Sequence, residues 1–440
     1  MKDKNIQYIN GSDVEFCGRI FLDRNFCTFR YNGEYFKALL PKVHNYNGVD
    51  LVNFFKSLSC KGFIPNTTAS ELRIKGLGQI FHQYTEHFNF HPKLSPVCSL
   101  QEAAFLWLKF NKFLATLGMG LADGHCSNIV FQGAMLPKWC DCGSIVSLCG
   151  EHPHLGIDEF IRFFIYPLQI REKNPALAEV SRSFTWRGVS HEVARAFALS
   201  PISLSLSREK ALDELWDMVN SMSFVVQHSN WSDYYQDDFA DLKENTNLRI
   251  NMFCRIFRAL HPATVVDIGA NSGFFSRYMA STGAEVCAIE PDESAVLKHW
   301  TVLRRKNFSH NIKLMMADIR DSAGVQGELA TALALTHHLF FTCHYPWKYI
   351  AELLSMFCTN SLLTEFMPNG LYVNIPDAPL PDNYRIELFA IQLERYFSSV
   401  EILPWSVPEG ASPRIFLLCR NKRATPRDDG WGYLPQEILL

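Results

Sequence analysis

Val265-Val266-Asp267-Ile268-Gly269-Ala270-Asn271-Ser272-Gly273-Phe274-Phe275-Ser276 is the stretch of sequence that decides the fold of this chain. Its apolar, β-branched beginning predicts a buried parallel strand from Thr264 to Ile268, and the run from Phe274 to Met279 predicts the start of a helix. The glycines between them permit tight backbone geometry. A strand, a glycine turn and a helix in this order are expected to place backbone N–H groups and a helix N-terminus at the carboxyl end of the strand, which predicts a site for a nucleotide-type cofactor.

Two acidic residues follow this stretch, each after an expected strand. Glu285 to Ile289 predicts a second strand that ends in Glu290, about twenty residues after the glycine turn, where a carboxylate can accept hydrogen bonds from both ribose hydroxyls. Ile312 to Met316 predicts a third strand that leads to Asp318. From that position a carboxylate or its neighbouring backbone can hydrogen-bond an adenine amino group.

Residues from about 246 to 440 resemble the class I S-adenosylmethionine-dependent methyltransferases, with V-V-D-I-G-A-N-S-G-F-F-S as the first motif and A-D-I as the adenine-side motif. The spacing D-x-G-x-x-x-G distinguishes the first motif from the G-x-G-x-x-G of NAD-binding folds. A dinucleotide-binding Rossmann domain, or a domain that keeps the fold without activity, remains as an alternative. The resemblance implies an α/β fold with a Rossmann-like seven-stranded sheet, a closing antiparallel hairpin at residues 400–403 and 415–419, and S-adenosylmethionine as the cofactor.

The resemblance also implies which residues bind the cofactor. The glycine turn surrounds the methionine part, the residue that ends the second strand holds the ribose, and the residue after the third strand lies near the adenine. Tyr234 or Tyr235 could close over the methionine end as part of a lid, although aromatic contacts between two domains would explain the same residues. The expected cofactor-binding residues are Asp267, Gly269, Asn271, Gly273, Glu290, Asp318 and Tyr234.

Two adjacent histidines are the candidates for catalysis. Transfer of a methyl group from a sulfonium is an in-line displacement, so a hydroxyl acceptor must be aligned and must lose its proton. Ala332 to Leu335 predicts the fourth strand, and His337 and His338 follow its carboxyl end, where ligands bind in open α/β sheets. One imidazole near neutral pKa could take the proton, while the other could simply hold the loop. Further acceptor-side candidates are His344, Tyr345, Trp347 and Glu365.

The first half of the chain has a different pattern. Phe16 to Leu40 alternates apolar and polar residues around turn signals, which predicts an antiparallel meander. Leu100 to Leu117 predicts an amphipathic helix with Ser99 as its cap. The aromatic run from Phe160 to Leu168 predicts core packing.

Three residues of the first half resemble the catalytic residues of protein kinases. Asp123 and Asn128 have the D-x-x-x-x-N spacing of the catalytic loop, and Asp141 takes the place of the D-F-G aspartate. The resemblance implies Asp123 as a base and the other two as Mg²⁺ ligands, with Lys37 as the best candidate for the conserved strand lysine. No G-x-G-x-x-G precedes them and Lys37 has no clear glutamate partner. We therefore expect a degenerate kinase-like domain, with an active kinase as the alternative.

A metal site is a rival interpretation of the same region. His125, Cys126, Cys140 and Cys142 could converge if the strands that carry them pair. Zinc sites usually use C-x-x-C turns, whereas thiols spaced C-x-C more often pack as small apolar side chains. The expectation is that no metal binds here.

Both halves together resemble a bacterial methyltransferase group that includes the NoeA-type nodulation proteins, through L-x-D-x-x-x-x-N-I-x-F at Leu121 to Phe131 and P-x-x-x-D-x-G-S at Pro137 to Ser144. The group usually has alanine at the position of Gly124, and glycans are one acceptor that it suggests. The expected domains are a kinase-like α+β domain at 1–150, a helical connector or lid at 151–245 and the methyltransferase domain at 246–440.

Composition and charge restrict the classes of substrate and the location that we expect. A formal net charge of −3 gives no electrostatic reason to expect a nucleic-acid substrate. No signal peptide or apolar run of about 18 residues is present, and the 13 cysteines are scattered, so we expect a cytoplasmic protein with reduced thiols and no membrane span. The N-P-P-Y signature of many amino-group methyltransferases is absent, which favours methyl transfer to oxygen on a small molecule or a glycan. A non-catalytic scaffold remains as an alternative.

Overall fold

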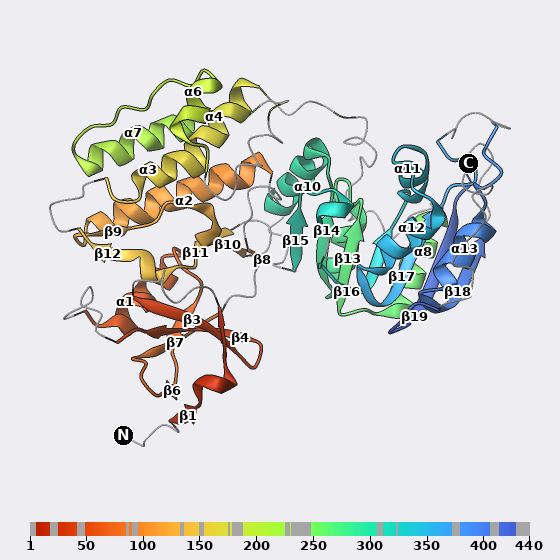
Figure 1. Ribbon diagram of the computed structural model, residues 1–440, viewed down its shortest axis with the longest axis horizontal. Helices are drawn as coiled ribbons and strands as arrows, with labels where there is room; N and C mark the ends of the chain where they lie inside the picture. Colours follow the sequence, from red (N-terminus) through yellow and green to blue (C-terminus); the bar gives the residue numbers. More distant parts are fainter. Residues whose placement is uncertain are drawn as a thin grey trace. The chain divides into compact units, whose positions relative to one another are not determined.

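The structure is a computed structural model, and it describes residues 6–17, 25–41, 49–84, 88–89, 96–132, 136–148, 154–174, 177, 188–224, 229, 248–305, 311–322, 324–371, 379–404 and 413–427. The chain divides into two compact units, Met1–Gln227 and His228–Leu440 (Figure 1). The helices within residues 157–221, expected as part of a connector, are grouped with the first unit. The division into three domains stays a prediction.

A five-stranded antiparallel sheet opens the first unit. Three of its strands, in chain order, form the expected meander, which is confirmed: Glu15 lies opposite Arg30, and Thr28 lies opposite Lys37. One face of the sheet is covered by α1 (Leu51–Cys60), whose Phe55 packs 4.9 Å from the Phe81 ring. The order is β2 (Glu15–Cys17), β3 (Phe26–Tyr31), β4 (Glu34–Leu39), β7 (Ile80–Gln83) and β5 (Thr67–Ala69).

The rest of the first unit is mainly helical and packs around α2 (Val97–Ala115). The Trp107 and Phe160 rings stack 4.3 Å apart, and both side chains are completely buried, which confirms the core packing predicted for the aromatic run. The helices on this side are α3 (Ile157–Phe160), a π-helix (Ile161–Ile165), α4 (Tyr166–Lys173), α6 (His191–Ala196) and α7 (Arg208–Ser221). The short strands are β1 (Gln7–Ile9), β6 (Leu72–Ile74), β8 (Phe88–Asn89), β9 (Met119–Leu121), β10 (Ile129–Gln132), β11 (Leu136–Trp139) and β12 (Ile145–Ser147).

The expected cap of α2 is wrong. The helix begins at Val97, after Pro96, and Ser99 is a buried residue of the first turn. Pro96 is extended, and its carbonyl oxygen accepts hydrogen bonds from the backbone N–H groups of Ser99 and Leu100. A proline without an N–H can stand where a helix begins, so its position and not the serine hydroxyl sets the start.

The second unit is built on a seven-stranded sheet, and this prediction is confirmed. The strand order is β15-β14-β13-β16-β17-β19-β18, with every neighbouring pair parallel except those that involve β19. Pairing of β18 with β19 also confirms the closing antiparallel hairpin. The strands are β13 (Thr264–Ile268), β14 (Glu285–Ile289), β15 (Ile312–Met315), β16 (Gly327–Ala332), β17 (Cys358–Phe366), β18 (Phe397–Pro404) and β19 (Ile415–Lys422).

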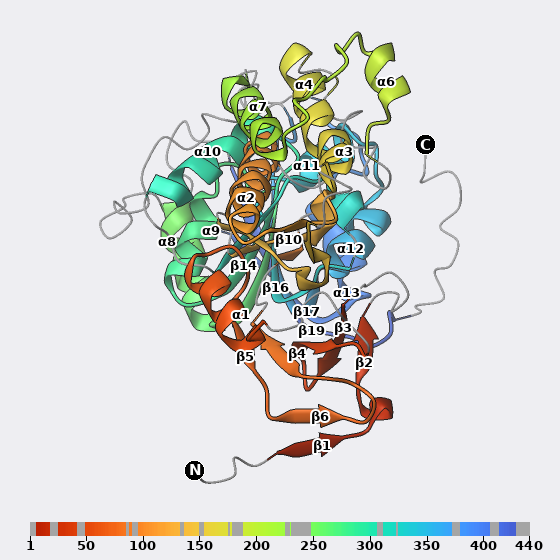
Figure 2. The ribbon, with the colours of Figure 1, turned by 90° about the vertical axis from the view of Figure 1, so that its left-hand side faces the viewer.

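Helices lie on both faces of this sheet. Figure 2 shows α8, α9 and α10 on one face and α12 and α13 on the other. The bounds are α8 (Leu248–Leu260), α9 (Phe274–Ser281), α10 (Glu293–Arg305), α11 (Thr336–Phe341), α12 (Trp347–Ser355) and α13 (Ile386–Glu394). Strands covered on both faces are expected to be apolar throughout, and Val265, Val266 and Ile268 of β13 are each nearly completely buried. Across the described residues of both units, no helix has the length and apolar character needed to cross a membrane.

Candidate active site

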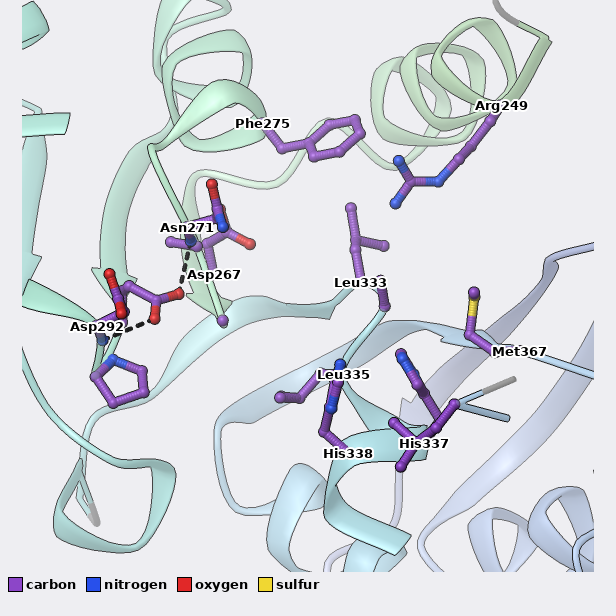
Figure 3. Close-up of a pocket in the computed structure, with 16 residues that line it drawn as sticks. Arg249, Asp267, Asn271, Phe275, Asp292, Leu333, Leu335, His337, His338 and Met367 are labelled. Carbon is purple, nitrogen blue, oxygen red and sulfur yellow. Dashed lines mark hydrogen bonds between the residues drawn. The ribbon is translucent and has the colours of Figure 1, made fainter. Parts of the chain in front are cut away.

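A cavity of about 630 Å³ lies at the carboxyl ends of the central parallel strands (Figure 3). This volume is within the range of about 300–1,000 Å³ that is typical of small-molecule sites. The position is also the one where ligands bind in open α/β sheets. The lining residues are Arg249, Asp267, Gly269, Ala270, Asn271, Phe275, Glu290, Pro291, Asp292, Leu333, Ala334, Leu335, His337, His338, Met367 and Leu371.

The glycine turn forms one wall of the cavity, but its backbone N–H groups do not point outward as expected. The amides of Gly269 and Ala270 both donate to the Ile289 carbonyl, at 2.9 and 3.0 Å. The amide of Gly273 donates to the Ala270 carbonyl, and the amide of Ser272 donates to the Asn271 side chain. The tight geometry itself is present, with φ values of 72° at Gly269 and 75° at Gly273. The turn therefore gives the cavity its shape, while its own hydrogen bonds fix that shape.

Asp267 is buried at the end of β13 and lines the cavity. Its Oδ2 accepts a hydrogen bond from the Ser276 hydroxyl at 2.5 Å, and its Oδ1 accepts one from the Thr331 hydroxyl at 2.7 Å. Burial raises the pKa of Asp267, although these two hydrogen bonds act in the opposite direction. One oxygen thus links β13 to α9 and the other links β13 to β16, so Asp267 stabilises the wall of the cavity.

Glu290, at the end of β14, is the buried carboxylate at the other side of the turn. Its Oε2 accepts a hydrogen bond from the Asn271 backbone N–H at 2.8 Å, and its Oε1 accepts one from the Asp292 backbone N–H at 2.9 Å (dashed lines in Figure 3). Burial raises its pKa to about 7. Each carboxylate oxygen has a second lone pair, so an ionised Glu290 can also accept from hydroxyl groups of a ligand.

The two candidate histidines both line the cavity, at the start of α11 and next to each other. Their ring centroids are 4.1 Å apart. Burial lowers the pKa of His337 to about 3 and also lowers the pKa of His338, so both imidazoles are neutral at neutral pH. The Nδ1 atom of His337 is buried and has no hydrogen-bond partner among the described residues. A buried polar atom without a partner costs free energy, which marks His337 as the histidine that a ligand would satisfy.

An ion-pair network at the other end of the cavity was not predicted. Glu365, at the end of β17, is completely buried and does not line the cavity. Its carboxylate accepts from Nε and Nη2 of Arg249, at 2.6 and 2.8 Å, and from Nη1 of Arg414 at 3.3 Å. Arg249 does line the cavity, from α8. A usable signal was present in the sequence, because Arg249 stands four residues before the buried Phe253, on the apolar stripe of that helix.

Two of the expected cofactor residues do not line the cavity, and a third lies outside the described residues. Gly273 is the N-cap of α9, and Asp318 accepts a hydrogen bond from Arg320 at 2.7 Å on the surface; neither lines the cavity. Tyr234 lies outside the described residues, as does Tyr235. The roles expected for them stay predictions.

The acceptor-side candidates of the aromatic segment after α11 also do not line the cavity. His344 and Tyr345 are described residues outside its wall. Trp347 is buried, and its indole N–H donates to the Asn383 carbonyl at 2.9 Å. The spacing of residues in the sequence could not show whether these side chains line the cavity, pack in the core or lie on the surface.

Two of the three residues that resemble kinase catalytic residues contact each other. The amide of Asn128 contacts Oδ2 of Asp141 at 3.5 Å, whereas Asp123 accepts the Trp107 indole N–H through its backbone oxygen. Lys37 is buried on β4 and donates to the Thr28 hydroxyl at 2.9 Å. The interpretation of this region as a kinase-like domain stays a prediction.

The packing around Gly124 requires glycine at this position. A Cβ at this position would lie 2.3 Å from both the Gly156 carbonyl oxygen and the Phe160 nitrogen. Its own N–H donates to Glu159 at 2.7 Å. The loop is packed so closely against α3 that only glycine fits.

The thiols near this loop are all in the described part of the chain. Among the described residues, no group of three or more histidine, cysteine or acidic side chains could hold a metal ion. Cys126 and Cys142 are buried, and burial raises the pKa of Cys140 to about 11. His125 instead contacts the hydroxyl of Ser127 at 2.6 Å.

Comparison with protein-family models gave no match, and comparison with curated proteins gave none either. Parts of the chain are similar to solved structures. WbdD, a bifunctional kinase-methyltransferase, shows 20% identity and a TM-score of 0.32 over 41% of this chain and 42% of that chain. Magnesium protoporphyrin IX methyltransferase (ChlM) from Synechocystis PCC 6803 shows 15% identity and a TM-score of 0.32 over 43% of this chain and 92% of that one.

EvdMO1 is a third similar structure, with 17% identity and a TM-score of 0.30 over 39% of this chain and 40% of that chain. The chain spans less than half the length of WbdD and of EvdMO1. Structural similarity at these TM-scores does not support a conclusion about function. The function is therefore inferred from the residues of the cavity.

Proposed function

We propose that this protein is an S-adenosylmethionine-dependent methyltransferase that methylates an oxygen of a small-molecule or glycan acceptor. The observation that carries the proposal is the cavity at the carboxyl ends of the parallel strands. It has a carboxylate that can bind hydroxyl groups at one end and, at the other, a buried imidazole whose Nδ1 has no hydrogen-bond partner in the part of the chain that the structure describes. In Figure 3 Asp292, beside Glu290, and His337 lie on different sides of this cavity.

The residues present fit the cofactor. Glu290 is suited to the ribose hydroxyls because two backbone N–H groups already hold its carboxylate in place. The glycine turn, fixed by its own hydrogen bonds, and the Asp267 wall would hold the methionine part. When bound, S-adenosylmethionine supplies an electrophilic methyl group on a sulfonium centre.

The acceptor end would be organised by the two neutral histidines. His337 stays unprotonated at any pH above about 3, so its Nδ1 can accept a hydrogen bond from an acceptor hydroxyl throughout the physiological range. Such a bond orients the hydroxyl oxygen, which is one requirement of methyl transfer to oxygen. A pKa of about 3 makes His337 a weak base, so it fits this orienting role better than the proton abstraction expected of an imidazole near neutral pKa. His338, whose ring contacts that of His337 at an interplanar angle of 43°, would hold the ring in place.

A second candidate function is nucleotide binding by the first unit. It is favoured by the contact of Asn128 with Asp141 and by the buried Lys37 on β4, which are the residue types that bind Mg²⁺ and phosphate in kinases. If the first unit is an active kinase and the second an active methyltransferase, the protein is a bifunctional enzyme. If neither unit is active, the protein is a scaffold.

Calorimetric titration with S-adenosylhomocysteine tests the proposal. The wild-type protein, Glu290→Ala and Glu285→Ala are compared, because Glu285 begins the same strand but is exposed and outside the cavity. We expect binding by the wild type and by Glu285→Ala and loss of binding in Glu290→Ala. No binding by the wild type would favour the scaffold.

A parallel titration with Mg²⁺-ATP tests the second candidate. Asp141→Asn keeps the acceptor oxygen that caps the Gly143 backbone N–H but removes the charge. Binding of Mg²⁺-ATP that is lost in this variant would support a bifunctional enzyme. Absence of ATP binding together with retained S-adenosylhomocysteine binding would leave the methyltransferase alone.

A further inference from the structure

Apolar side chains accompany His337 in the wall of the cavity. Figure 3 shows Met367 and His337 on the side of the cavity away from Asp292. Met367 follows β17 directly, and only 2% of it is exposed. Leu333 and Leu335, which precede His337 in the chain, line the cavity as well. Methionine is flexible and polarizable, so a wall of this kind adapts to the apolar part of a ligand.

Leu371 continues this apolar wall to the surface of the second unit. The residue lines the cavity, and 42% of it is exposed. A ligand that covers the Leu371 side chain removes apolar surface from water, which favours binding when the covering part of the ligand is itself apolar.

Two backbone carbonyl groups at this end are already used within the protein. The Met367 carbonyl accepts hydrogen bonds from the Tyr384 hydroxyl at 2.8 Å and from the Gly370 N–H at 2.9 Å. The Leu335 carbonyl accepts from two backbone N–H groups of α11, at 3.0 and 3.2 Å. A carbonyl oxygen has two lone pairs, so both acceptors have their full number of hydrogen bonds before any ligand binds.

His337 is different from these carbonyl groups. Its Nδ1 atom is buried and has no hydrogen-bond partner within the described ranges. The neighbouring cation of the lining, Arg249, is paired with the buried Glu365 through two hydrogen bonds. The wall therefore combines one acceptor atom that a ligand hydroxyl can satisfy with apolar side chains around it.

From this arrangement we propose that the acceptor is a small molecule with an apolar body, bound through a single hydroxyl group, and not a glycan. The inference rests on the proposed methyltransferase function and names the substrate class of the same site. The hydroxyl donates to Nδ1 of His337, and the apolar body packs against Met367 and Leu371. A glycan would bring several hydroxyls to this wall, and each hydroxyl that lost its water without gaining a partner would weaken binding.

Two compounds with the same carbon ring test the substrate class. Cyclohexanol carries one hydroxyl, whereas myo-inositol carries one on every carbon. Each is added to protein saturated with S-adenosylhomocysteine, and binding is measured by ligand-observed NMR. We expect cyclohexanol to bind and myo-inositol not to bind. Equal or tighter binding of myo-inositol, or no binding of cyclohexanol, would overturn the proposal.

Cyclohexanone tests the hydrogen bond to Nδ1 of His337. It has nearly the same shape as cyclohexanol, but its oxygen can only accept a hydrogen bond. We expect it to bind about threefold or more weakly than cyclohexanol, because a buried acceptor is left without a donor. Cyclohexanone that binds as tightly as cyclohexanol would refute the role of Nδ1.

Leu371→Gln tests whether cyclohexanol binds at the apolar wall. Glutamine is close to leucine in size but polar, and the exposure of Leu371 makes the change compatible with folding. Ile391→Gln is the matched control, because Ile391 of α13 is 51% exposed and outside the cavity. Cyclohexanol should bind about threefold or more weakly to Leu371→Gln and unchanged to the control. An unchanged affinity in Leu371→Gln, or an equal loss in both variants, would contradict the inference.

Failure of the proposed function has a different outcome. A wild-type protein that does not bind S-adenosylhomocysteine would contradict the methyltransferase function. Cyclohexanol added to the free protein would still decide whether the cavity binds an apolar hydroxyl compound: binding that is weakened in Leu371→Gln supports this chemistry, and binding that is absent or unchanged refutes it.

Discussion

Gly273 and His299 are in direct contact beneath the glycine turn: a Cβ on Gly273 would lie 2.1 Å from the Cε1 and Nε2 atoms of the His299 ring. The ring is completely buried, so it has no space into which to move. The left-handed φ of 75° at Gly273 adds a second reason for glycine.

Gly273→Ala is therefore expected to reduce the free energy of unfolding by about 2–4 kcal/mol. Gly283→Ala is the matched control, because Gly283 also has a positive φ but has open space around its Cα. Chemical denaturation measures both. Addition of His299→Ala should recover part of the loss in Gly273→Ala, and no recovery would show that the contact is not the cause.

His299 makes the second unit sensitive to acid. Burial and the nearby Arg277 lower its pKa to about 3, and neither ring nitrogen has a hydrogen-bond partner among the described residues. The unfolded chain binds a proton at this residue below about pH 6.5, whereas the folded protein does not until about pH 3, so stability falls as the pH decreases across this window.

His299→Leu should remove this contribution, which is about 1.4 kcal/mol per pH unit at most. It should also raise the stability at pH 8 by about 1 kcal/mol or more, because an unsatisfied polar ring is replaced by an apolar side chain. Denaturation curves at pH 8, 6 and 5 measure both effects. A variant with unchanged pH dependence would mean that the imidazole is hydrated in solution.

Cofactor affinity is expected to depend on pH through Glu290. The pKa of about 7 means that the carboxyl group is protonated below neutrality, and a protonated carboxyl accepts hydrogen bonds from hydroxyls less well. The affinity for S-adenosylhomocysteine should be constant above pH 8 and fall up to tenfold per unit below about pH 6.5. Calorimetry from pH 5.5 to 8.5 measures it. In Glu290→Gln the affinity should be low, and a pH dependence that persisted there would assign the titration to another group.

The two histidines of the cavity should differ in their effect on turnover. His337→Asn is expected to lower kcat by about 10²-fold or more with little change in S-adenosylhomocysteine affinity, since the buried Nδ1 of His337 has no partner within the described ranges and is the atom offered to the acceptor. His338→Asn should have a smaller effect on kcat. Radiolabelled methyl transfer to the acceptor, combined with calorimetry, separates the two quantities. Equal losses in both variants would contradict the distinct role of His337.

Gly124→Ala tests the packing of the first unit. The added Cβ would collide with backbone atoms of α3 and the residue before it, and backbone cannot move as easily as a side chain. We expect a loss of about 2–4 kcal/mol in the unfolding of the first unit. Gly11→Ala, which has open space, is the control. Differential scanning calorimetry should show a shift of one transition only, and a shift of both would mean that the two units unfold together.

Local patterns predicted the second unit well because its elements depend on neighbours in sequence. The β-branched run at 264–268, the glycines after it and the acidic residue after the next strand together led to the seven-stranded sheet and to a cavity wall that contains Asp267 and Glu290. The start of α2 was misjudged because Ser99 and Pro96 are competing signals, and steric restriction at proline is the stronger one.

Contacts between distant residues could not be predicted in the same way. Arg249 and Glu365 are 116 positions apart, and Glu365 and Arg414 are 49 apart, so their ion pairs arise only when the sheet has formed. The N–H groups of the glycine turn were expected to face a ligand, and this was wrong. Two of them donate to the Ile289 carbonyl instead, which the pairing of β13 with β14 brings next to the turn.

The position of β19 between β17 and β18 has a consequence for biosynthesis. Because β18 precedes β19 in the chain, a growing polypeptide leaves the outer edge of β17 without a neighbour until β19 has left the ribosome. Glu365 lacks Arg414 for the same interval. Unpaired edges of sheets are sites where chains associate with one another. The nascent protein is thus open to aggregation from the time β17 emerges until β19 has followed it.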